Sequence, residues 1–379
     1  MAKIKQNIFF LIFIVSFGLN GQELKLGINN LDAIILETKN KNIAVVGNQT
    51  SVIQNTHLVD TLLELGIKVK LVFSPEHGFR GVEDAGAHIN NEIDQRTGLQ
   101  IFSLHGENKK PSINQLKNID IIIFDIQDVG ARFYTYISTL HYVLEAASEQ
   151  NIQVLVLDRP NPNGHYIDGP ILEEKFKSFI GMHPIPIVHA MTIGEYAKMI
   201  IGEKWIENTC DLKVIEMVNY NRSEIYDLPI KPSPNLPNKR AVNLYPSLCL
   251  FERTTISVGR GTNYPFQHYG APFIKSSYSF LPKSGPGSKY PKHENKICYG
   301  INLRYQKNIL NSLNINWLIK CYDQSLDKEK FFTLNFDKLA GTDQLRKQIT
   351  SGVSAEKIKE SWQEGLTKFK KTRAKYLIY

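Results

Sequence analysis

The stretch Val69–Gly81 reads Val-Lys-Leu-Val-Phe-Ser-Pro-Glu-His-Gly-Phe-Arg-Gly. Its first five residues are mostly apolar and include β-branched side chains, a pattern that is typical of a short buried strand. Pro75 favours an extended conformation at Ser74, so the strand is expected to run directly into a turn. The stretch therefore predicts one strand of a sheet with a tight polar loop at its carboxyl end.

This loop groups three side chains that can do chemistry: Glu76, His77 and Arg80. The glycines Gly78 and Gly81 allow a positive φ or a close approach to a ligand. In an open α/β sheet, ligands bind in the crevice outside the carboxyl ends of the strands. The alternative is a polar turn in which Glu76 and Arg80 pair in water, and the other segments of the chain decide between the two interpretations.

Strand-like and helix-like segments alternate around this stretch. The sequence predicts strands over residues 43–46, 119–124, 154–157 and 185–188, and helices over 58–65, 136–148 and 193–201. Such alternation is typical of a mostly parallel sheet with helices on both faces. We therefore expect an α/β fold with a Rossmann-like architecture over residues 22–250.

The character of the sequence changes after about Leu250. Residues 265–291 are rich in Gly, Pro, Ser and Tyr, and residues 301–305 and 331–336 look like isolated strands. Ile358, Trp362, Leu366 and Phe369 are spaced as on one face of an amphipathic helix. We expect a smaller C-terminal α+β domain over residues 251–379.

The N-terminus predicts export. Lys3 and Lys5 precede an apolar run over residues 8–19, and small residues follow it, so residues 1–21 are expected to be a secretory signal peptide. The run is too short for a membrane span, although a membrane anchor is the alternative. We expect an exported bacterial protein, periplasmic or secreted, with no stable membrane anchor once the signal is removed.

The composition of the chain limits the classes of partner and cofactor that it can be expected to bind. The chain has 379 residues and a formal net charge of +8, without basic runs, so no nucleic acid is expected as a partner. Cys210, Cys249, Cys298 and Cys321 are scattered, with no metal-finger spacing. They are either buried free thiols or members of one or two disulfides, and no structural zinc is expected.

Polar groups follow other predicted elements. Residues Asp125–Tyr136 read Asp-Ile-Gln-Asp-Val-Gly-Ala-Arg-Phe-Tyr-Thr-Tyr directly after the 119–124 strand. On a strand, Asp125 and Gln127 would share one face. Asp128, Arg132 and Tyr134 add further polar groups to the same loop, which suggests a site. The alternative is a helix cap with a structural Asp–Arg pair.

Two more loops offer ligand-binding groups. Residues Asp158–Gly164 read Asp-Arg-Pro-Asn-Pro-Asn-Gly, in which the prolines would hold Asn161 and Asn163 rigidly. A plain connector is the alternative. Thr192 and Glu195 have the spacing of a capping box, so Glu195 is expected to be structural. His189, just before them, is either a site residue or a core residue.

Arg260 lies in a Gly-Arg-Gly turn within Ser257–Thr262, preceded by Glu252. The turn holds only a fragment of a dinucleotide-binding fingerprint, and the first strand ends in Gly-Asn-Gln-Thr rather than in one. The sequence therefore supports neither NAD nor ATP as a ligand.

Together these motifs resemble the exo-β-N-acetylmuramidases of the NamZ type, a glycoside hydrolase family formerly known as a domain of unknown function. The motifs that carry the resemblance are Ser74–Gly81, Gln127–Tyr136, Asp158–Gly164, Met191–Glu195, Pro232–Pro237 and Ser257–Thr262. It covers the chain from about Leu26 to Tyr379. Two departures are Ala190, where the family usually has glycine, and Arg253-Thr254-Thr255 in place of a more usual Gly-Thr-Asn.

The resemblance implies a Rossmann-like catalytic domain beside a smaller C-terminal domain, with the active site in the cleft between them. It also implies release of N-acetylmuramic acid from the non-reducing ends of peptidoglycan fragments in cell-wall turnover, without a cofactor. The catalytic glutamate of the family falls on Glu76.

Glycoside hydrolysis needs an acid and usually a second carboxylate. Glu76 is the expected acid, Asp128 or Asp125 its partner, and His77 a group that orients Glu76 or binds a hydroxyl. The lactyl carboxylate of muramic acid suits an arginine fork. The expected substrate-binding residues are Arg80, Gln127, Arg132, Tyr134, Asn161, Asn163, His189 and Arg260.

Two other classes of protein fit the same residues. A metal-dependent hydrolase of cell-wall material could use Glu76, His77, Asp125, Asp128 and His189 as ligands. A non-catalytic protein that binds muropeptides would also explain the export and the arginines. The sequence leaves the stereochemical outcome and the oligomeric state open.

Overall fold

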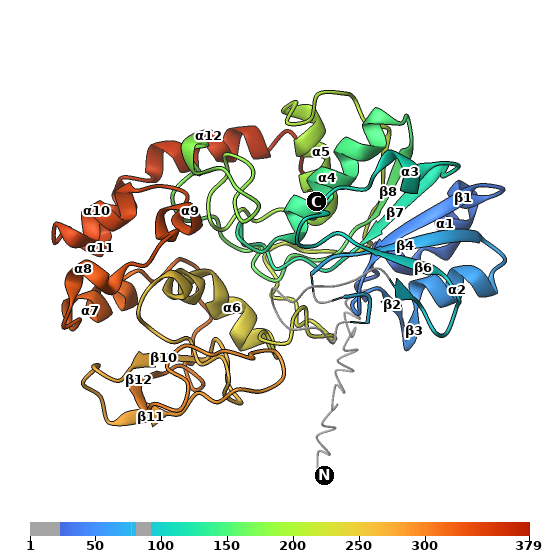
Figure 1. Ribbon diagram of the computed structural model, residues 1–379. Helices are drawn as coiled ribbons and strands as arrows, with labels where there is room; N and C mark the ends of the chain where they lie inside the picture. The colour runs from blue at the N-terminus through green and yellow to red at the C-terminus, as the bar shows by residue number, and fades with distance from the viewer. Residues whose placement is uncertain (1–22, 77, 81–91) are drawn as a thin grey trace, which may run out of the picture.

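The computed structural model describes residues 23–76, 78–80 and 92–379 (Figure 1). The predicted signal peptide, His77 and Gly81 lie outside the described residues. Within the described ranges, no helix has the length and apolar content needed to cross a membrane.

A mostly parallel sheet forms the centre of the first domain, as predicted. Among the described residues it has seven strands in the order β5-β6-β4-β1-β7-β8-β9. All neighbours are parallel except β5, which runs antiparallel to β6. The strands are β1 (Asn42–Gly47), β4 (Lys68–Ser74), β5 (Glu92–Ile93), β6 (Gln100–Ser103), β7 (Ile121–Asp125), β8 (Gln153–Leu157) and β9 (Leu212–Ile215).

The strand order reverses at β1. The chain passes from β1 to β4 on one side and later returns to β7 on the other side of β1. Such a switch point opens a crevice at the carboxyl ends of the strands, because the following loops turn away in opposite directions. The loops after β4 and β7, which carry most of the predicted site residues, therefore flank the end of β1.

Helices cover both faces of this sheet, which confirms the predicted architecture (Figure 1). Alternate residues of β1 point to opposite faces, so Val45 packs in one apolar cluster with Leu62, and Val46 in the other with Leu140. The first face is covered by α1 (Leu31–Thr38) and α2 (Leu58–Glu64), and the second by α4 (Tyr136–Glu149) and α5 (Ile193–Gly202). Short elements here are η1 (Gly27–Asn29), β2 (Val52–Ile53), β3 (Thr56–His57), α3 (Ile113–Leu116) and η2 (Glu174–Phe176).

The C-terminal part is α+β, as predicted. An antiparallel sheet in the order β10-β12-β11 lies below the helices in Figure 1. Its strands are β10 (His268–Ala271), β11 (Tyr278–Phe280) and β12 (Cys298–Asn302). The helices are α6 (Lys239–Leu248), η3 (Cys249–Arg253), α7 (Asn316–Asp323), α8 (Lys328–Phe331), α9 (Phe336–Ala340), α10 (Gln344–Thr350), α11 (Ala355–Glu360) and α12 (Gln363–Arg373).

Some predicted elements are corrected. Residues 185–188 form no strand of the sheet, since Val188 makes only isolated bridges to Ala131 and Asp168. Residues 331–336 join α8 to α9 instead of forming a strand, because their aromatic side chains pack between helices. The predicted C-terminal helix is divided into α11 and α12 just before Trp362 turns into the core.

The four cysteines are free and buried, so the free-thiol alternative holds. Burial raises the pKa of each thiol to about 12, because a thiolate would lose its hydration. These thiols are inert core residues at neutral pH.

Candidate active site

Glu76 lies at the carboxyl end of β4. The N–H of Leu104 donates to the carbonyl of Ser74 (2.8 Å), which prolongs the sheet up to the turn. The N–H of Gly78 donates to the carbonyl of Pro75 (3.2 Å), and Gly78 has a φ of +77° that favours glycine. The predicted strand and turn are confirmed, and they place Glu76 at the tip of the turn.

Three strand-end loops meet at Glu76. Its carboxylate is partly exposed, and its Oε2 accepts a hydrogen bond from Thr135 Oγ1 (3.2 Å), just ahead of α4. The hydroxyl of Tyr136 lies 3.5 Å from the carbonyl oxygen of Glu76 and accepts a hydrogen bond from Asn48 Nδ2 (3.0 Å). Asn48 directly follows β1, so the loops after β1, β4 and β7 converge at the switch point.

Glu76 borders a small cavity of about 70 Å³. The walls come from both predicted domains, since one side is the 133–136 segment and the other comes from α6 and the Gly-Arg-Gly turn. Aromatic rings make up much of the lining, as they do in many ligand sites. The lining residues are Glu76, Phe133, Tyr134, Thr135, Tyr136, Ser233, Leu236, Tyr245, Arg260 and Phe266.

Arg260 brings a positive charge to this cavity, as the sequence suggested. Its Nε donates to Glu252 Oε2 (2.9 Å), and its guanidinium carbon lies 5.1 Å from the centre of the Phe266 ring. Gly259 and Gly261 on either side have φ of +77° and +76°, so the turn depends on both glycines. The Glu252 ion pair and the ring hold Arg260 in one orientation at the cavity wall.

Tyr134 also lines the cavity, but its hydroxyl is already engaged. It donates to the carbonyl of Pro232 (2.8 Å), the residue before Ser233 in the opposite wall. Burial raises the pKa of Tyr134 well above its ordinary value, so the hydroxyl stays protonated and keeps this bond. Tyr134 therefore fixes the distance between the two walls.

Arg132 is not placed to bind substrate. Its side chain is fully buried, and its guanidinium donates to the carbonyls of Pro170 and Ile185 (both 2.8 Å) and of Ala340 (2.6 Å). These carbonyls belong to both parts of the chain, so Arg132 joins the loop after β7 to α9. In contrast to its predicted contact with substrate, Arg132 is not among the described lining residues of the Glu76 cavity.

Asp125 is likewise structural. Arg159 Nε and Nη2 donate to its two carboxylate oxygens at 2.6 and 2.9 Å, and both side chains are buried. This fork links the loops after β7 and β8. The alternative, a structural Asp–Arg pair, is thus observed, with Arg159 as the partner of Asp125. Asp125 is not among the described lining residues of the cavity.

The predicted amides hold loops together. Gln127 Nε2 donates to the carbonyls of Asp128 and Pro160, and Asn163 Nδ2 donates to those of Val129 and Val242. Asn161 Nδ2 donates to the carbonyl of Met191 (2.9 Å). All three side chains are buried and none is among the described lining residues of the Glu76 cavity, in contrast to their predicted contact with substrate.

Asp128 and His189 form a buried pair behind the cavity wall. Asp128 Oδ2 accepts from the N–H of Gly130 (2.6 Å) and lies 3.8 Å from His189 Nε2, too far for a hydrogen bond. Burial raises the pKa of Asp128 to about 7 and lowers that of His189 to about 3. Neither residue lines the cavity, which argues against Asp128 as the second catalytic carboxylate and His189 as a substrate ligand.

Arg80 points away from the cavity. Its Nη2 donates to both carboxylate oxygens of Asp94 (3.1 and 2.9 Å), and its Nη1 lies 3.8 Å from Asp60 Oδ2. It stabilises the outside of the turn. His77, the remaining predicted residue of this loop, lies outside the described residues.

Seven of the described lining residues were not singled out from the sequence: Phe133, Thr135, Tyr136, Ser233, Leu236, Tyr245 and Phe266. Phe133, Thr135 and Tyr136 stand in the quoted motif after β7, and Ser233 and Leu236 stand in the Pro232–Pro237 motif. Tyr245 and Phe266 have no local signal, because an aromatic residue in an apolar segment is usually core.

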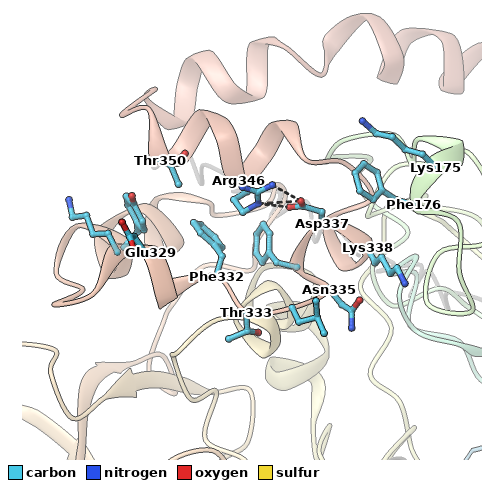
Figure 2. A pocket seen from close by; sticks show the side chains of 14 residues that line it. Lys175, Phe176, Glu329, Phe332, Thr333, Asn335, Asp337, Lys338, Arg346 and Thr350 are labelled. Carbon is cyan, nitrogen blue, oxygen red and sulfur yellow. Dashed lines mark hydrogen bonds and ion pairs between the residues drawn. The ribbon is translucent and has the colours of Figure 1, made fainter.

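A larger cavity of about 780 Å³ lies between η2 and the helices α7 to α10 (Figure 2). Phe332 and the ion pair between Asp337 and Arg346 form part of its lining. None of the predicted site residues lines it. The carboxylate of Asp337 and the guanidinium of Arg346 are paired with each other, whereas the smaller cavity is lined by the predicted site residues Glu76, Tyr134 and Arg260.

Within the described ranges, no group of three or more His, Cys, Asp or Glu residues is arranged to hold a metal ion.

Comparisons with known proteins place the chain in one family. Residues 43–240 match the family described as exo-β-N-acetylmuramidase NamZ, N-terminal, and residues 243–379 match its C-terminal counterpart. The chain is 42% identical over 376 residues to the peptidoglycan β-N-acetylmuramidase NamZ of Bacillus subtilis (strain 168), covering 90% of this chain and 88% of the relative.

Two solved structures of DUF1343 family proteins from Bacteroides fragilis are also similar. One superposes with a TM-score of 0.88 at 46% identity, and the other with a TM-score of 0.81 at 27% identity. Each comparison covers 94% of this chain and 99% of the other. The fold is thus shared over nearly the whole length of each chain.

Proposed function

Since the chain belongs to the exo-β-N-acetylmuramidase NamZ family, we propose that it releases N-acetylmuramic acid from the non-reducing ends of peptidoglycan fragments. It is a glycoside hydrolase of cell-wall turnover. The observation that supports the assignment most directly is Glu76, a partly exposed carboxylate at the switch point of the sheet that borders an aromatic cavity.

Glu76 is the general acid in this proposal. Cleavage of a glycosidic bond requires a proton on the leaving oxygen, and a carboxyl group within hydrogen-bond reach supplies it. Thr135 Oγ1 donates a hydrogen bond to Oε2 of this carboxyl group. Thr135 therefore orients the carboxyl group while Glu76 meets the substrate.

Arg260 recognises the lactyl carboxylate of the muramoyl residue. It is the cation among the described lining residues of the Glu76 cavity, and its guanidinium is held by Glu252 and Phe266. A guanidinium fork matches a carboxylate better than an ammonium group does. The same charge predicts a preference for muramic acid over N-acetylglucosamine, which lacks the lactyl group.

The test is a product analysis with the mature protein. A disaccharide with N-acetylmuramic acid at its non-reducing end should yield the two free monosaccharides, and the reversed disaccharide should stay intact. Binding without release would favour the non-catalytic alternative. Loss of activity with a chelator and its return with a metal would favour the metal-dependent one.

We also propose that residues 1–21 direct export, on the basis of the basic start and the apolar run. Mass spectrometry of the protein recovered outside the cytoplasm should show a new N-terminus near residue 21. An intact N-terminus on a protein that stays in the cytoplasm would contradict this.

A further inference from the structure

A second cavity, of about 740 Å³, adjoins the one at Glu76. The same two stretches of chain separate them. In the Pro232–Pro237 motif, Ser233 and Leu236 line the Glu76 cavity, while Pro234, Asn235 and Pro237 line the second one. The Gly-Arg-Gly turn divides in the same way, with Arg260 on one side and Gly261 on the other.

The walls of the second cavity are fixed by hydrogen bonds. Asn235 Nδ2 donates to the carbonyl of Gly287 (2.7 Å), and the N–H of Lys283 donates to the carbonyl of Gly261 (2.9 Å). A side chain at Gly261 would place its Cβ only 2.4 Å from the carbonyl oxygen of Lys283. The loop that contains Lys283 is thus packed closely against the turn that carries Arg260.

The lining of the second cavity is cationic. Lys231, Lys283 and Arg304 border it, and no carboxylate stands among its described lining residues. None of the three forms an ion pair with a carboxylate in the part of the chain that the structure describes. Three positive charges around one cavity, with no carboxylate paired to them among the described residues, favour an anionic ligand.

Arg304 is oriented for such a ligand. Its Nε donates to Asn302 Oδ1 (3.1 Å), and its guanidinium carbon lies 4.1 Å from the centre of the Tyr264 ring. Tyr264 also lines the cavity and is 41% exposed, so its ring offers an apolar surface beside the charge. A sugar ring that carries a carboxylate presents a matching combination of apolar C–H groups and negative charge.

We propose that this cavity binds the leaving part of the saccharide and that Lys231, Lys283 and Arg304 hold a carboxylate on its first muramoyl residue. The inference rests on the proposed function. Peptidoglycan alternates N-acetylglucosamine and N-acetylmuramic acid, so the fragment that leaves Glu76 carries its next carboxylate one sugar further on. The volume falls within the range of sites for ligands of this size.

The kinetic test compares two substrates. One is a chromogenic muramide, and the other is a tetrasaccharide that begins with muramic acid. In the triple variant Lys231→Ala, Lys283→Ala, Arg304→Ala, KM for the tetrasaccharide should rise about tenfold more than KM for the muramide, since each pair contributes a few-fold. Lys296→Ala, an exposed lysine outside the cavity, is the matched control. Equal changes in both KM values would overturn the proposal.

A binding test does not depend on catalysis. The disaccharide of N-acetylglucosamine and N-acetylmuramic acid, with muramic acid at the reducing end, should bind the wild-type protein more tightly than the neutral disaccharide of two N-acetylglucosamines. The difference should vanish in the triple variant and shrink at high salt. A second arm uses the same disaccharide with an acidic dipeptide on the lactyl group, which distinguishes the lactyl carboxylate from one on the peptide stem.

The two failures are distinguishable. If the wild-type protein cleaves no muramide but binds the charged disaccharide more tightly than the neutral one, the proposed function is wrong, while the assignment of the second cavity as a carboxylate-binding site is supported. If it cleaves both substrates and binds the charged and neutral disaccharides equally, the cavity assignment fails and the function stands.

Discussion

The loops after β4 and β7 flank the end of β1 on either side, and both are crowded with charged side chains. The first presents Glu76, partly exposed, to a cavity. The second buries its charges, since Asp125 is held by Arg159 and Arg132 is held by backbone carbonyls. Charged side chains thus take part in the proposed reaction in the loop after β4, whereas they hold the structure together in the loop after β7.

The difference follows from the neighbours of each side chain. A buried charge persists only when it is fully paired or hydrogen-bonded, because it has lost its hydration. The loop after β7 lies under the 158–164 loop and beside α9, which supply such partners. The tip of the turn after β4 faces the cavity instead, so Glu76 keeps access to a ligand. Removing a charge should therefore have different effects in the two loops.

The largest effect is expected for Glu76→Gln. It should lower kcat on the muramic acid disaccharide by on the order of 10²–10⁴-fold, because the proton for the leaving oxygen is lost. The midpoint of urea unfolding should stay unchanged. Glu64→Gln, an exposed residue at the end of α2, is the control for both measurements. A large loss of stability in Glu76→Gln would show that the charge of Glu76 is structural. The loops after β4 and β7 would then use their charges in the same way.

The opposite result is expected for Asp125→Asn. Arg159 would stay buried with a weaker partner, and the free energy of unfolding should fall by about 3–5 kcal/mol. Asp337→Asn is the matched control, since Asp337 accepts a similar fork from Arg346 (2.9 and 2.7 Å) but is partly exposed. Its cost should stay below about 1 kcal/mol. Similar losses of unfolding free energy in Asp125→Asn and Asp337→Asn would show that burial does not determine how much an Asp–Arg pair contributes to stability.

Asp128 predicts a pH dependence of stability. Because burial raises its pKa from 3.8 to about 7, the folded protein keeps a proton here that the unfolded chain loses. This contribution is fully present below pH 3.8 and is lost as the pH rises through about 7. Asp128→Asn cannot ionise, so its stability relative to the wild type should increase between pH 5 and pH 8.

His189 acts in the opposite direction. Its pKa is lowered from 6.5 to about 3, so its contribution is present above pH 6.5 and is lost as the pH falls. The difference between Asp128→Asn and the wild type cancels this effect, since both proteins contain His189. Urea unfolding at each pH gives the difference, and a value independent of pH would mean that Asp128 is ionised in the folded protein.

The smallest effect is expected at Ala190, one of the two departures from the family pattern expected from the sequence. Ala190 has a φ of +53°, which strains a residue with a Cβ, and its carbonyl accepts a hydrogen bond from Arg222 (2.8 Å) that fixes this conformation. Ala190→Gly should raise the free energy of unfolding by about 1 kcal/mol. Ala146→Gly in α4 should lower it by about as much. Destabilisation by Ala190→Gly would show that the strain is small.

The sequence predicted the sheet because its central strands are short β-branched runs that local pattern identifies. It also placed Glu76, since Pro75 and Gly78 determine the turn locally. It did not predict the orientation of Arg132, because the carbonyls that hold its guanidinium are 38 to 208 residues away along the chain. The prediction of a strand over residues 331–336 was wrong for a related reason. Aromatic residues that pack between helices have the same local pattern as a strand.

The most direct test of the central claim is the dependence of the Glu76→Gln variant on the leaving group. A general acid matters for a sugar leaving group, which needs a proton, and much less for a dinitrophenyl group, which leaves as a stable anion. The account predicts that Glu76→Gln loses far more kcat/KM on the muramic acid disaccharide than on a dinitrophenyl muramide. Equal losses on the two substrates would contradict the role of Glu76 as the acid.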